Sequence, residues 1–339
     1  MKRIAIDAMG GDHGSSVVLP AVEDALRAYP DLQVVLVGLE SVLSAHKANV
    51  ADAIASRIDY VYATEVVEMG ESPSKAMRGK KDSSMRVAIN MVKEGRADAC
   101  VSSGNTGALM ATARFVLKTL PGIDRPAILS RFPTCKDYPV RVLDLGANVD
   151  SSAEHLFQFA LMGSIVASAV AGIDRPKVGL LNIGEEEIKG NEQVKQTAEL
   201  LQNSEAINYI GYVEGDDLFT GAVDVIVCDG FVGNIALKAV EGAVRFVGGH
   251  LQKAYTKNWL TRFCFLPLRP VKKLIDPRRY NGASFVGLDG VVIKSHGSAD
   301  RLAFLKAIEE ALAEVDKNIP QLIKDNLHQD VPTETPTEE

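Results

Sequence analysis

Residues 3–14 read RIAIDAMGGDHG, a short apolar run followed directly by a glycine-rich turn. An apolar run before such a turn is typical of the first strand of a nucleotide-binding α/β fold. The dinucleotide fingerprint spaces its glycines as G-x-G-x-x-G and needs an acidic residue about 20 positions later. Here the glycines stand at positions 10, 11 and 14, and Glu40 lies too far along the chain. The stretch therefore predicts a strand-to-helix turn beside a ligand cleft, with Gly10 and Gly11 letting the backbone approach the ligand.

Strand and helix patterns alternate along the rest of the chain. Apolar, β-branched runs predict strands at residues 3–7, 33–38, 59–64, 97–103, 126–132, 140–146, 177–184, 208–214 and 222–230. Helical patterns predict helices at about 16–28, 84–94, 106–119, 152–171, 191–203, 231–255 and 299–315. Most strands lack strict alternation, as expected where both faces of a parallel sheet are covered. The chain is therefore predicted to be an α/β protein with a doubly wound, mostly parallel sheet in two lobes, with a cleft between them.

The domain organisation follows from the absence of a linker or internal repeat. Residues 1–328 are predicted to form a single α/β catalytic unit of two intimate lobes. Residues 329–339 are acidic and proline-bearing, and are predicted to be a disordered tail. The most membrane-like run, residues 157–172, contains polar and small side chains and is short for a span, so it predicts a buried helix.

Charge and cysteine usage exclude several classes of protein. The formal net charge of −7 argues against a nucleic-acid binder, whose phosphate contacts need a basic surface. The four cysteines are far apart and form neither a disulfide framework nor a zinc motif, which indicates reduced thiols in a cytoplasmic protein. No compact metal-ligand cluster and no G-x-S-x-G nucleophile elbow are present, so neither a metal nor a cofactor is expected.

The stretch SSGNTGALM, residues 102–110, carries the sharpest local signal. Its two glycines allow tight turns, and Thr106 is expected to cap a helix that begins near Ala108. The backbone amides left free at such a helix start form a nest suited to phosphate. A plain capped helix start remains the alternative. The predicted phosphate-binding residues are Ser103, Gly104, Asn105, Thr106 and Gly107.

Two further strand-end turns carry candidate catalytic groups. In NIGEEEIKGNE, residues 182–192, Lys189 can offset negative charge over a cleft, although a solvated acidic helix start is an equal reading. In CDGFVGNIALK, residues 228–238, Asn234 can donate its amide to a developing oxyanion, or it can simply satisfy a helix end.

Ligands gather at the carboxyl ends of strands in such sheets, so these turns are expected to converge on one polar site. The residues predicted to line its cleft are Asp7, Gly10, Gly11, His13, Asp144, Asn148, Asp229 and His296.

Two segments are basic in an otherwise acidic chain. Residues 250–280 mix Lys and Arg with large apolar side chains, which predicts contact with a membrane surface or an acidic partner; a helical hairpin packed on a sister subunit is the alternative. Residues 72–84, SPSKAMRGKKDSS, suggest a mobile anion-binding flap, with Ser83 as a helix cap. The residues predicted to make the membrane or partner contact are Trp259, Arg262, Phe263, Arg269, Lys272 and Lys273.

Taken together, the motifs DAMGGDHG, SPSKAMRGKKDSS, SGNTGALMA, LDLGAN, NIGEEEIKGNE, CDGFVGNIALK and YNGASFVGLDG…KSHGS follow in one order. Because of these motifs and their order, the chain resembles the bacterial phosphate acyltransferases of phospholipid synthesis over about residues 3–315. One small departure is Ser103, where alanine is more usual. The resemblance implies a phosphotransacetylase-like or isocitrate/isopropylmalate dehydrogenase-like fold and a homodimer.

The resemblance also implies an activity. Inorganic phosphate would attack the thioester of acyl-[acyl-carrier-protein] (acyl-ACP) to give acyl phosphate and free ACP, with Lys189 and Asn234 as the catalytic residues. The product would pass to a glycerol-3-phosphate acyltransferase at the inner face of the cell membrane, where this enzyme is expected to associate peripherally. The main alternative is an acyl-CoA:phosphate acyltransferase of the phosphotransacetylase type. The chain lacks the arginine and aspartate clusters that a β-decarboxylating dehydrogenase would need. A non-catalytic scaffold would leave the polar turns unexplained.

Overall fold

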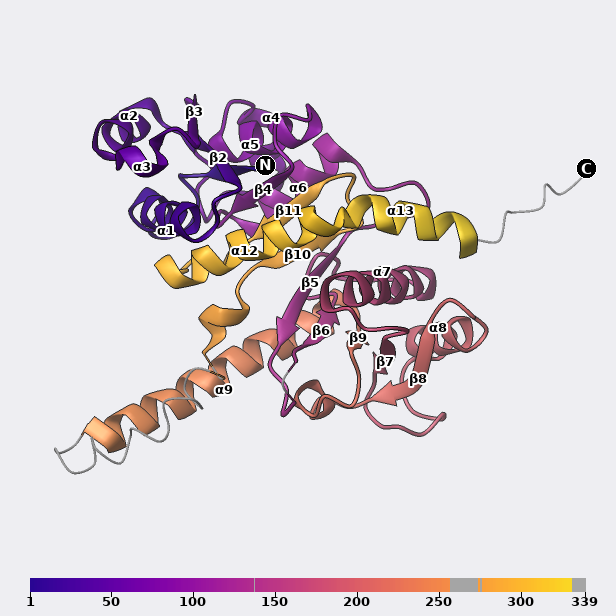
Figure 1. The fold of residues 1–339 in the computed structure, drawn as a ribbon. Helices are drawn as coiled ribbons and strands as arrows, with labels where there is room; N and C mark the ends of the chain where they lie inside the picture. The colour runs from indigo at the N-terminus through magenta and orange to yellow at the C-terminus, as the bar shows by residue number, and fades with distance from the viewer. Residues whose placement is uncertain (137, 257–273, 275, 331–339) are drawn as a thin grey trace, which may run out of the picture.

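One 11-stranded sheet runs through the molecule, as Figure 1 shows. The computed structural model describes residues 1–136, 138–256, 274 and 276–330. In spatial order the strands are β3 (Ile58–Tyr62), β2 (Leu32–Gly38), β1 (Lys2–Asp7), β4 (Ala99–Ser102), β11 (Val291–Lys294), β10 (Ala283–Val286), β5 (Ala127–Phe132), β6 (Val140–Leu143), β9 (Val225–Val227), β7 (Lys177–Leu181) and β8 (Asn208–Val213).

The direction of the strands reverses near the centre of the sheet. Strands β3, β2, β1, β4 and β11 are parallel, and so are β6, β9, β7 and β8. Between these blocks the pairs β11–β10, β10–β5 and β5–β6 are antiparallel. Three reversals leave the two blocks running in opposite directions, so their carboxyl ends lie at opposite edges of the sheet. The strand-end turns therefore fall into two groups, one from each block of strands.

Helices cover both faces of the sheet, which confirms the predicted doubly wound α/β fold. Helices α1 and α12 pack on each other over one face of the first block, and α5 and α6 lie on its other face. Helix α7 packs on β6, β9, α8 and α13. The helix bounds are α1 Ser15–Ala28, α2 Glu40–Asn49, α3 Asp52–Ala55, α4 Pro73–Gly79, α5 Ser84–Lys93, α6 Thr106–Leu117, α7 Ala153–Ala171, α8 Glu192–Gln202, α9 Gly230–Thr256, α12 Arg301–Lys317 and α13 Ile319–Asp330, with 3₁₀ turns at Asp217–Phe219 and Pro277–Tyr280.

The segment predicted to be a mobile flap is in part a packed helix. Helix α4 lies against α6, and the Lys80 ammonium donates hydrogen bonds to Glu71 Oε2 (2.7 Å) and Val66 O (2.6 Å). The predicted cap is confirmed, because the Ser83 hydroxyl accepts a hydrogen bond from the Arg86 amide at the start of α5. Internal packing and pairing thus hold part of the basic stretch in place.

Helix α7 is long and apolar enough to span a membrane by length and composition alone. It is instead a core helix: Leu156 and Phe159 are fully buried against the second block of strands. Gly163 lets it approach the sheet, since an added Cβ would lie 2.7 Å from Leu143 Cδ1 and from Val225 Cγ1. The buried helix predicted over residues 157–172 is therefore confirmed.

We expect Gly163→Ala to lower the free energy of unfolding by about 1–3 kcal/mol, because the added methyl overpacks this contact. Gly242→Ala is the matched control, since Gly242 is also helical and an added Cβ there meets no atom within 4 Å. The control should be neutral or stabilising by up to about 1 kcal/mol, from helix propensity alone. Urea unfolding measures both, and equal effects at the two glycines would contradict the packing argument.

Candidate functional site

The first group of turns is organised around the buried carboxylate of Asp7, at the end of β1. Its Oδ1 accepts a hydrogen bond from the Ser84 hydroxyl (2.7 Å), and its Oδ2 accepts one from the Ser102 hydroxyl (2.7 Å). Burial raises the pKa of Asp7, and these two hydroxyl donors oppose part of the rise. The carboxylate thus ties β1, β4 and the start of α5 together beneath the glycine turns.

Glycines let the turns after β1, β4 and β11 touch one another. A Cβ on Gly10 would lie 2.6 Å from the Gly104 nitrogen. One on Gly11 would lie 2.7 Å from Ser103 Oγ and 2.9 Å from the Gly297 carbonyl oxygen, and Gly11 has a positive φ of 87°. The Ser103 hydroxyl donates to the Gly10 carbonyl (2.8 Å). Larger residues would separate these three turns, so glycine is required here.

The start of α6 forms as predicted except for its capping residue. Asn105, not Thr106, is the cap: its Oδ1 accepts a hydrogen bond from the Ala108 amide (2.9 Å). Its Nδ2 donates to the Met69 (2.7 Å) and Glu71 (3.1 Å) carbonyls, which anchors the turn to a segment far away in sequence. Thr106 and Gly107 are exposed in the first helical turn, where backbone amides have no intrahelical acceptor. These amides are available to an anion.

A buried lysine that sequence reasoning missed lies beneath these turns. Lys294 is the last residue of β11, and its ammonium donates to the Ser103 carbonyl (3.3 Å) and to the Ser295 carbonyl. Two residues after Lys294, His296 is held by Asn281, whose Oδ1 accepts the His296 amide (2.9 Å). The one available signal was a charged residue that ends an apolar run, VVIK, directly before the turn SHGS.

Helix α9 connects this group of turns with the second group. In Figure 1, α9 begins beside the second block of strands and extends outward from the molecule. Its Glu241 lies 2.9 Å from the Lys238 ammonium and 4.0 Å from His296 Nε2. Burial lowers the pKa of His296, and Lys238 adds to this while Glu241 opposes it. The His296 Nδ1 accepts the Ser298 backbone amide (3.2 Å), so the neutral ring carries its proton on Nε2, which faces Glu241.

The second group of turns surrounds Asp144, which follows β6. Asp144 Oδ1 accepts the amides of Ile128 (2.8 Å) and Ala147 (2.9 Å), and Oδ2 accepts the Asn148 amide (2.8 Å). Burial raises its pKa while these donors lower it. The side chain of Asn148 is also used internally, donating to the Pro126 carbonyl (2.8 Å) and to Asp144 Oδ2 (3.0 Å). Both residues therefore shape this loop from within.

Asn234 presents its side chain beside that loop. A Cβ on Gly146 would lie 3.3 Å from Asn234 Cβ, and one on Gly230 would collide with the Asn148 carbonyl oxygen. Asp229 caps α9, because its Oδ1 accepts the amides of Phe231 (2.9 Å) and Val232 (3.0 Å). Asn234 is exposed, and it precedes Lys238 by one helical turn, so both lie on the same side of α9.

Lys189 lies in the exposed loop between β7 and α8. A Cβ on Gly184 would lie 3.1 Å from Lys189 Cγ, so the side chain runs along that glycine. The helix that follows the loop, α8, is joined to the segment after the Asp144 turn by a hydrogen bond from Gln193 Nε2 to the Ser151 carbonyl. Thus Lys189 and Asn234 belong to the second group of turns, while Ser103–Gly107 belong to the first.

Two predicted sets of residues take no part in these contacts. His13 is exposed, and among the described residues only its backbone carbonyl has a hydrogen-bond partner, the Ser16 hydroxyl (2.7 Å). The six residues predicted to contact a membrane or partner, Trp259, Arg262, Phe263, Arg269, Lys272 and Lys273, lie outside the described residues, as do residues 331–339 of the predicted tail.

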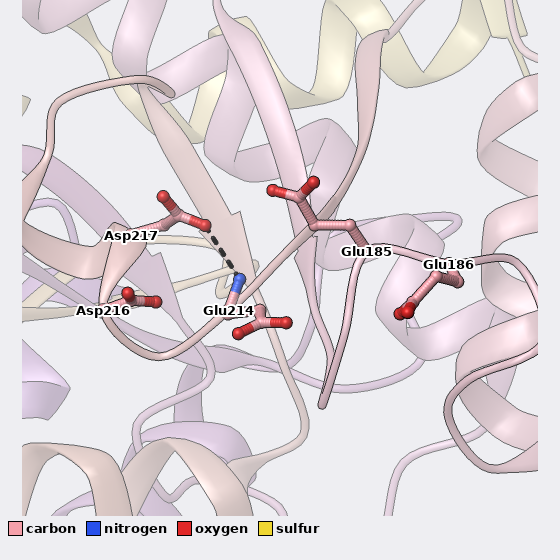
Figure 2. A pocket seen from close by; sticks show the side chains of 5 residues that line it. All are labelled: Glu185, Glu186, Glu214, Asp216 and Asp217. Carbon is pink, nitrogen blue, oxygen red and sulfur yellow. Dashed lines mark hydrogen bonds between the residues drawn. The ribbon is translucent and has the colours of Figure 1, made fainter.

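Figure 2 shows a pocket of about 440 Å³ that has the wrong charge for phosphate. It is lined by Glu185, Glu186, Glu214, Asp216 and Asp217, and Asp217 Oδ2 accepts the Glu214 amide (3.0 Å). In the described part of the chain, no group of three or more His, Cys, Asp or Glu side chains is placed to hold a metal ion. An anionic substrate would be repelled from this pocket, so the glycine turns are the better anion site.

Comparison with known proteins settles the family. A family model described as "Fatty acid synthesis protein" matches residues 2–322. A phosphate acyltransferase of Coxiella burnetii is 57% identical over 333 residues, covering 96% of this chain and 97% of that protein. The chain belongs to the phosphate acyltransferase family. A second phosphate acyltransferase, from Legionella pneumophila, is 56% identical over 329 residues and covers 96% of both chains.

Solved structures confirm the fold of this phosphate acyltransferase family member. A phosphotransacetylase from Streptococcus pyogenes aligns with a TM-score of 0.62 at 17% identity, over 93% of this chain and 94% of that one. A branched-chain phosphotransacylase from Enterococcus faecalis aligns with a TM-score of 0.61 at 14% identity, over 93% and 99%. Of the two fold types that the sequence suggested, these neighbours support the phosphotransacetylase-like one.

Membership of the phosphate acyltransferase family makes the chain an acyltransferase of fatty acid and phospholipid synthesis, with phosphate as a substrate. The thiols of Cys100 and Cys228 are poor candidates for a covalent nucleophile, since both are buried and burial raises the pKa of each. Among the described residues, the glycine turns over Asp7 and Lys294 suit phosphate better than the acidic pocket of Figure 2 does.

Ser102 tests whether the Asp7 network supports phosphate binding. Its hydroxyl donates to Asp7 and also accepts the Gly104 amide (3.0 Å), whereas the Ser84 hydroxyl has Asp7 as its one partner among the described residues. We expect Ser102→Ala and Ser84→Ala each to destabilise the fold by about 1–3 kcal/mol, because a buried acceptor loses a donor. Only Ser102→Ala should also raise KM for phosphate. Urea unfolding and steady-state kinetics distinguish the two, and an equal KM for both variants would contradict the assignment.

Proposed function

We propose that this chain catalyses attack of inorganic phosphate on acyl-ACP, giving acyl phosphate and free ACP. The observation that carries the proposal is the meeting of the turns after β1, β4 and β11 over a buried lysine. Backbone amides and a nearby cation are the groups that bind a phosphate dianion. Phosphate held in place next to a thioester needs no side-chain nucleophile, because positioning supplies much of the rate.

The step itself forms one bond and breaks one. A phosphate oxygen attacks the thioester carbonyl carbon, the C–S bond breaks, and the thiolate of the carrier's prosthetic arm leaves and takes up a proton. Lys189 would offset the charge that develops during attack, and Asn234 would donate its amide to the carbonyl oxygen as it becomes tetrahedral. The position of Asn234 on the same side of α9 as Lys238 supports this, since Lys238 is near enough to Lys294 and His296 to lower the pKa of each.

A long acyl chain is the donor group that the surroundings favour. Large apolar side chains are exposed on the turns that carry the proposed catalytic residues, and an acyl chain lying there would cover them. They are Val149 beside Asn148, Ile183 and Ile188 beside Lys189, and Phe231 and Ile235 beside Asn234. This supports a fatty acyl donor over an acetyl donor. The basic 250–280 segment favours ACP, an acidic protein, over CoA as the carrier.

The remaining parts of the proposal concern partners and location. We infer a homodimer that works in the cytoplasm and associates peripherally with the inner face of the cell membrane. Acyl phosphate is a reactive mixed anhydride, so transfer to a membrane-bound glycerol-3-phosphate acyltransferase at that surface would limit its hydrolysis. The basic and apolar composition of residues 250–280 supports both carrier docking and lipid contact.

The activity is tested by incubating the protein with phosphate and either acyl-ACP or acyl-CoA, then trapping acyl phosphate with hydroxylamine. The proposal expects trapped product with acyl-ACP and much less with acyl-CoA of the same chain length. Equal or greater yield from acyl-CoA would favour the phosphotransacetylase-type reaction. No product from either donor would refute the proposal.

We expect Lys189→Ala and Asn234→Ala each to reduce kcat by about 10²–10³ with little change in stability, because both side chains are exposed. Lys177→Ala is the matched control: Lys177 is also exposed, but it stands at the opposite end of β7. Single-turnover rates and thermal melts measure the two effects. A near wild-type rate for Lys189→Ala would remove that residue from the mechanism.

Charge reversal at Arg262, Lys272 and Lys273 should weaken both ACP-dependent turnover and binding to anionic liposomes. The reason is electrostatic, so raising the ionic strength should weaken the wild-type interactions in the same direction. Kinetics with acyl-ACP and liposome co-sedimentation measure the two interactions. Unchanged, salt-insensitive values for both would show that this segment contacts neither ACP nor lipid.

A further inference from the structure

Lys294 is a buried cation without a partner of opposite charge at contact distance. Its side chain is 7% exposed, and no carboxylate among the described residues lies within 4.0 Å of its ammonium. Its hydrogen bonds go to two neutral carbonyls, those of Ser103 and Ser295, which leaves its third N–H without a protein acceptor in the described part of the chain. A buried charge in such surroundings is costly unless something compensates it.

The charged groups around Lys294 offset only part of that cost. Asp7, from β1, has both oxygens engaged by the hydroxyls of Ser84 and Ser102. Asp12, in the turn after β1, is exposed, while Lys238 of α9 opposes the charge, and His296 follows two residues along the chain. Burial, opposed by Asp7 and Asp12, lowers the pKa of Lys294 to about 8.

The surroundings of Lys294 suit a small anion. Its ammonium lies 3.3 Å from the carbonyl of Ser103, in the turn that touches Gly10, Gly11 and Gly297. These glycines let the three turns approach one another closely, and the first-turn amides of α6 begin three residues after Ser103. A dianion at this junction would take backbone donors and neutralise the buried ammonium at once.

We propose that Lys294 is a phosphate-binding residue, whose ammonium supplies the fixed positive charge for the phosphate substrate beneath the turns at Gly10, Ser103 and Gly297. The proposal rests on the proposed function and adds to it the residue that holds the nucleophile. The buried lysine fixes where phosphate is seated, and Lys189 and Asn234 act on the thioester. Phosphate affinity then depends on the charge of Lys294, which is lost as the pH rises through the pKa of that lysine.

The test measures binding of inorganic phosphate to the full chain by calorimetry, with no acyl donor present. The variants are Lys294→Met and, as a matched control, Lys93→Met, because Lys93 is an exposed lysine at the end of α5. We expect Lys294→Met to weaken phosphate affinity at pH 7 by at least about 30-fold, in line with the loss of a charge-assisted contact. Lys93→Met should bind as wild type does.

The pH dependence distinguishes a lysine whose charge binds phosphate from a lysine that only donates hydrogen bonds to two carbonyls. Wild-type affinity should fall by about tenfold per pH unit above about pH 8, whereas Lys294→Met should be weak and show no such fall. Sulfate, whose own charge does not change over this range, should follow the same profile as a competitor. The wild-type profile with sulfate needs no variant, so it decides the question even if Lys294→Met does not fold.

Two results would overturn the proposal: Lys294→Met binding phosphate within about threefold of wild type, or wild-type affinity that does not change from pH 7 to about pH 9.5. Because this binding experiment uses no acyl donor, its result does not depend on whether the proposed acyl-ACP reaction takes place. Lys294-dependent phosphate binding without turnover of acyl-ACP would refute the proposed donor and keep this inference.

Discussion

The carboxylate of Asp7 is the contact on which the first half of the molecule depends. It is fully buried, and it accepts hydrogen bonds from hydroxyls on two other elements, Ser84 at the start of α5 and Ser102 at the end of β4. A buried carboxylate is tolerated only where such donors surround it. The requirement brings the ends of β1 and β4 together, and the glycines beyond them can then touch. The meeting of the glycine turns, where we propose that phosphate binds, follows from that local constraint.

The reversal of the sheet explains why the polar turns form two groups. Strands β1 and β4 end at one edge, and β6, β9 and β7 end at the other. Helix α9 joins the groups: its start packs on the Asp144 turn through Gly230 and Gly233, and its Glu241 faces His296. A two-substrate reaction fits this arrangement, since phosphate and thioester would approach from different groups of turns. The catalytic geometry would then depend on how α9 holds the two groups relative to each other.

Much of this was predictable from the sequence, because the signals are local. The strand and helix patterns, the turn of residues 102–107 and the strand-end positions of Asp7 and Asp144 follow from nearby residues. The capping residue of α6 could not be predicted from nearby residues, because Asn105 is selected by its contacts with Met69 and Glu71, some 35 positions earlier. Lys294 was missed for a related reason: its partner Ser103 is 191 positions away. Strands β10 and β11 were not predicted, and the reversal of the sheet went unseen with them, because it depends on pairing between distant segments: Ser284 of β10 pairs with Leu129 of β5.

The most direct measurement is a crystal structure of the full chain with inorganic phosphate bound. The account predicts phosphate at the junction of the Gly10–Gly11, Ser103–Gly104 and His296–Gly297 turns, within hydrogen-bond distance of the Lys294 ammonium. Phosphate seated only beside Lys189, away from all three turns, would contradict it.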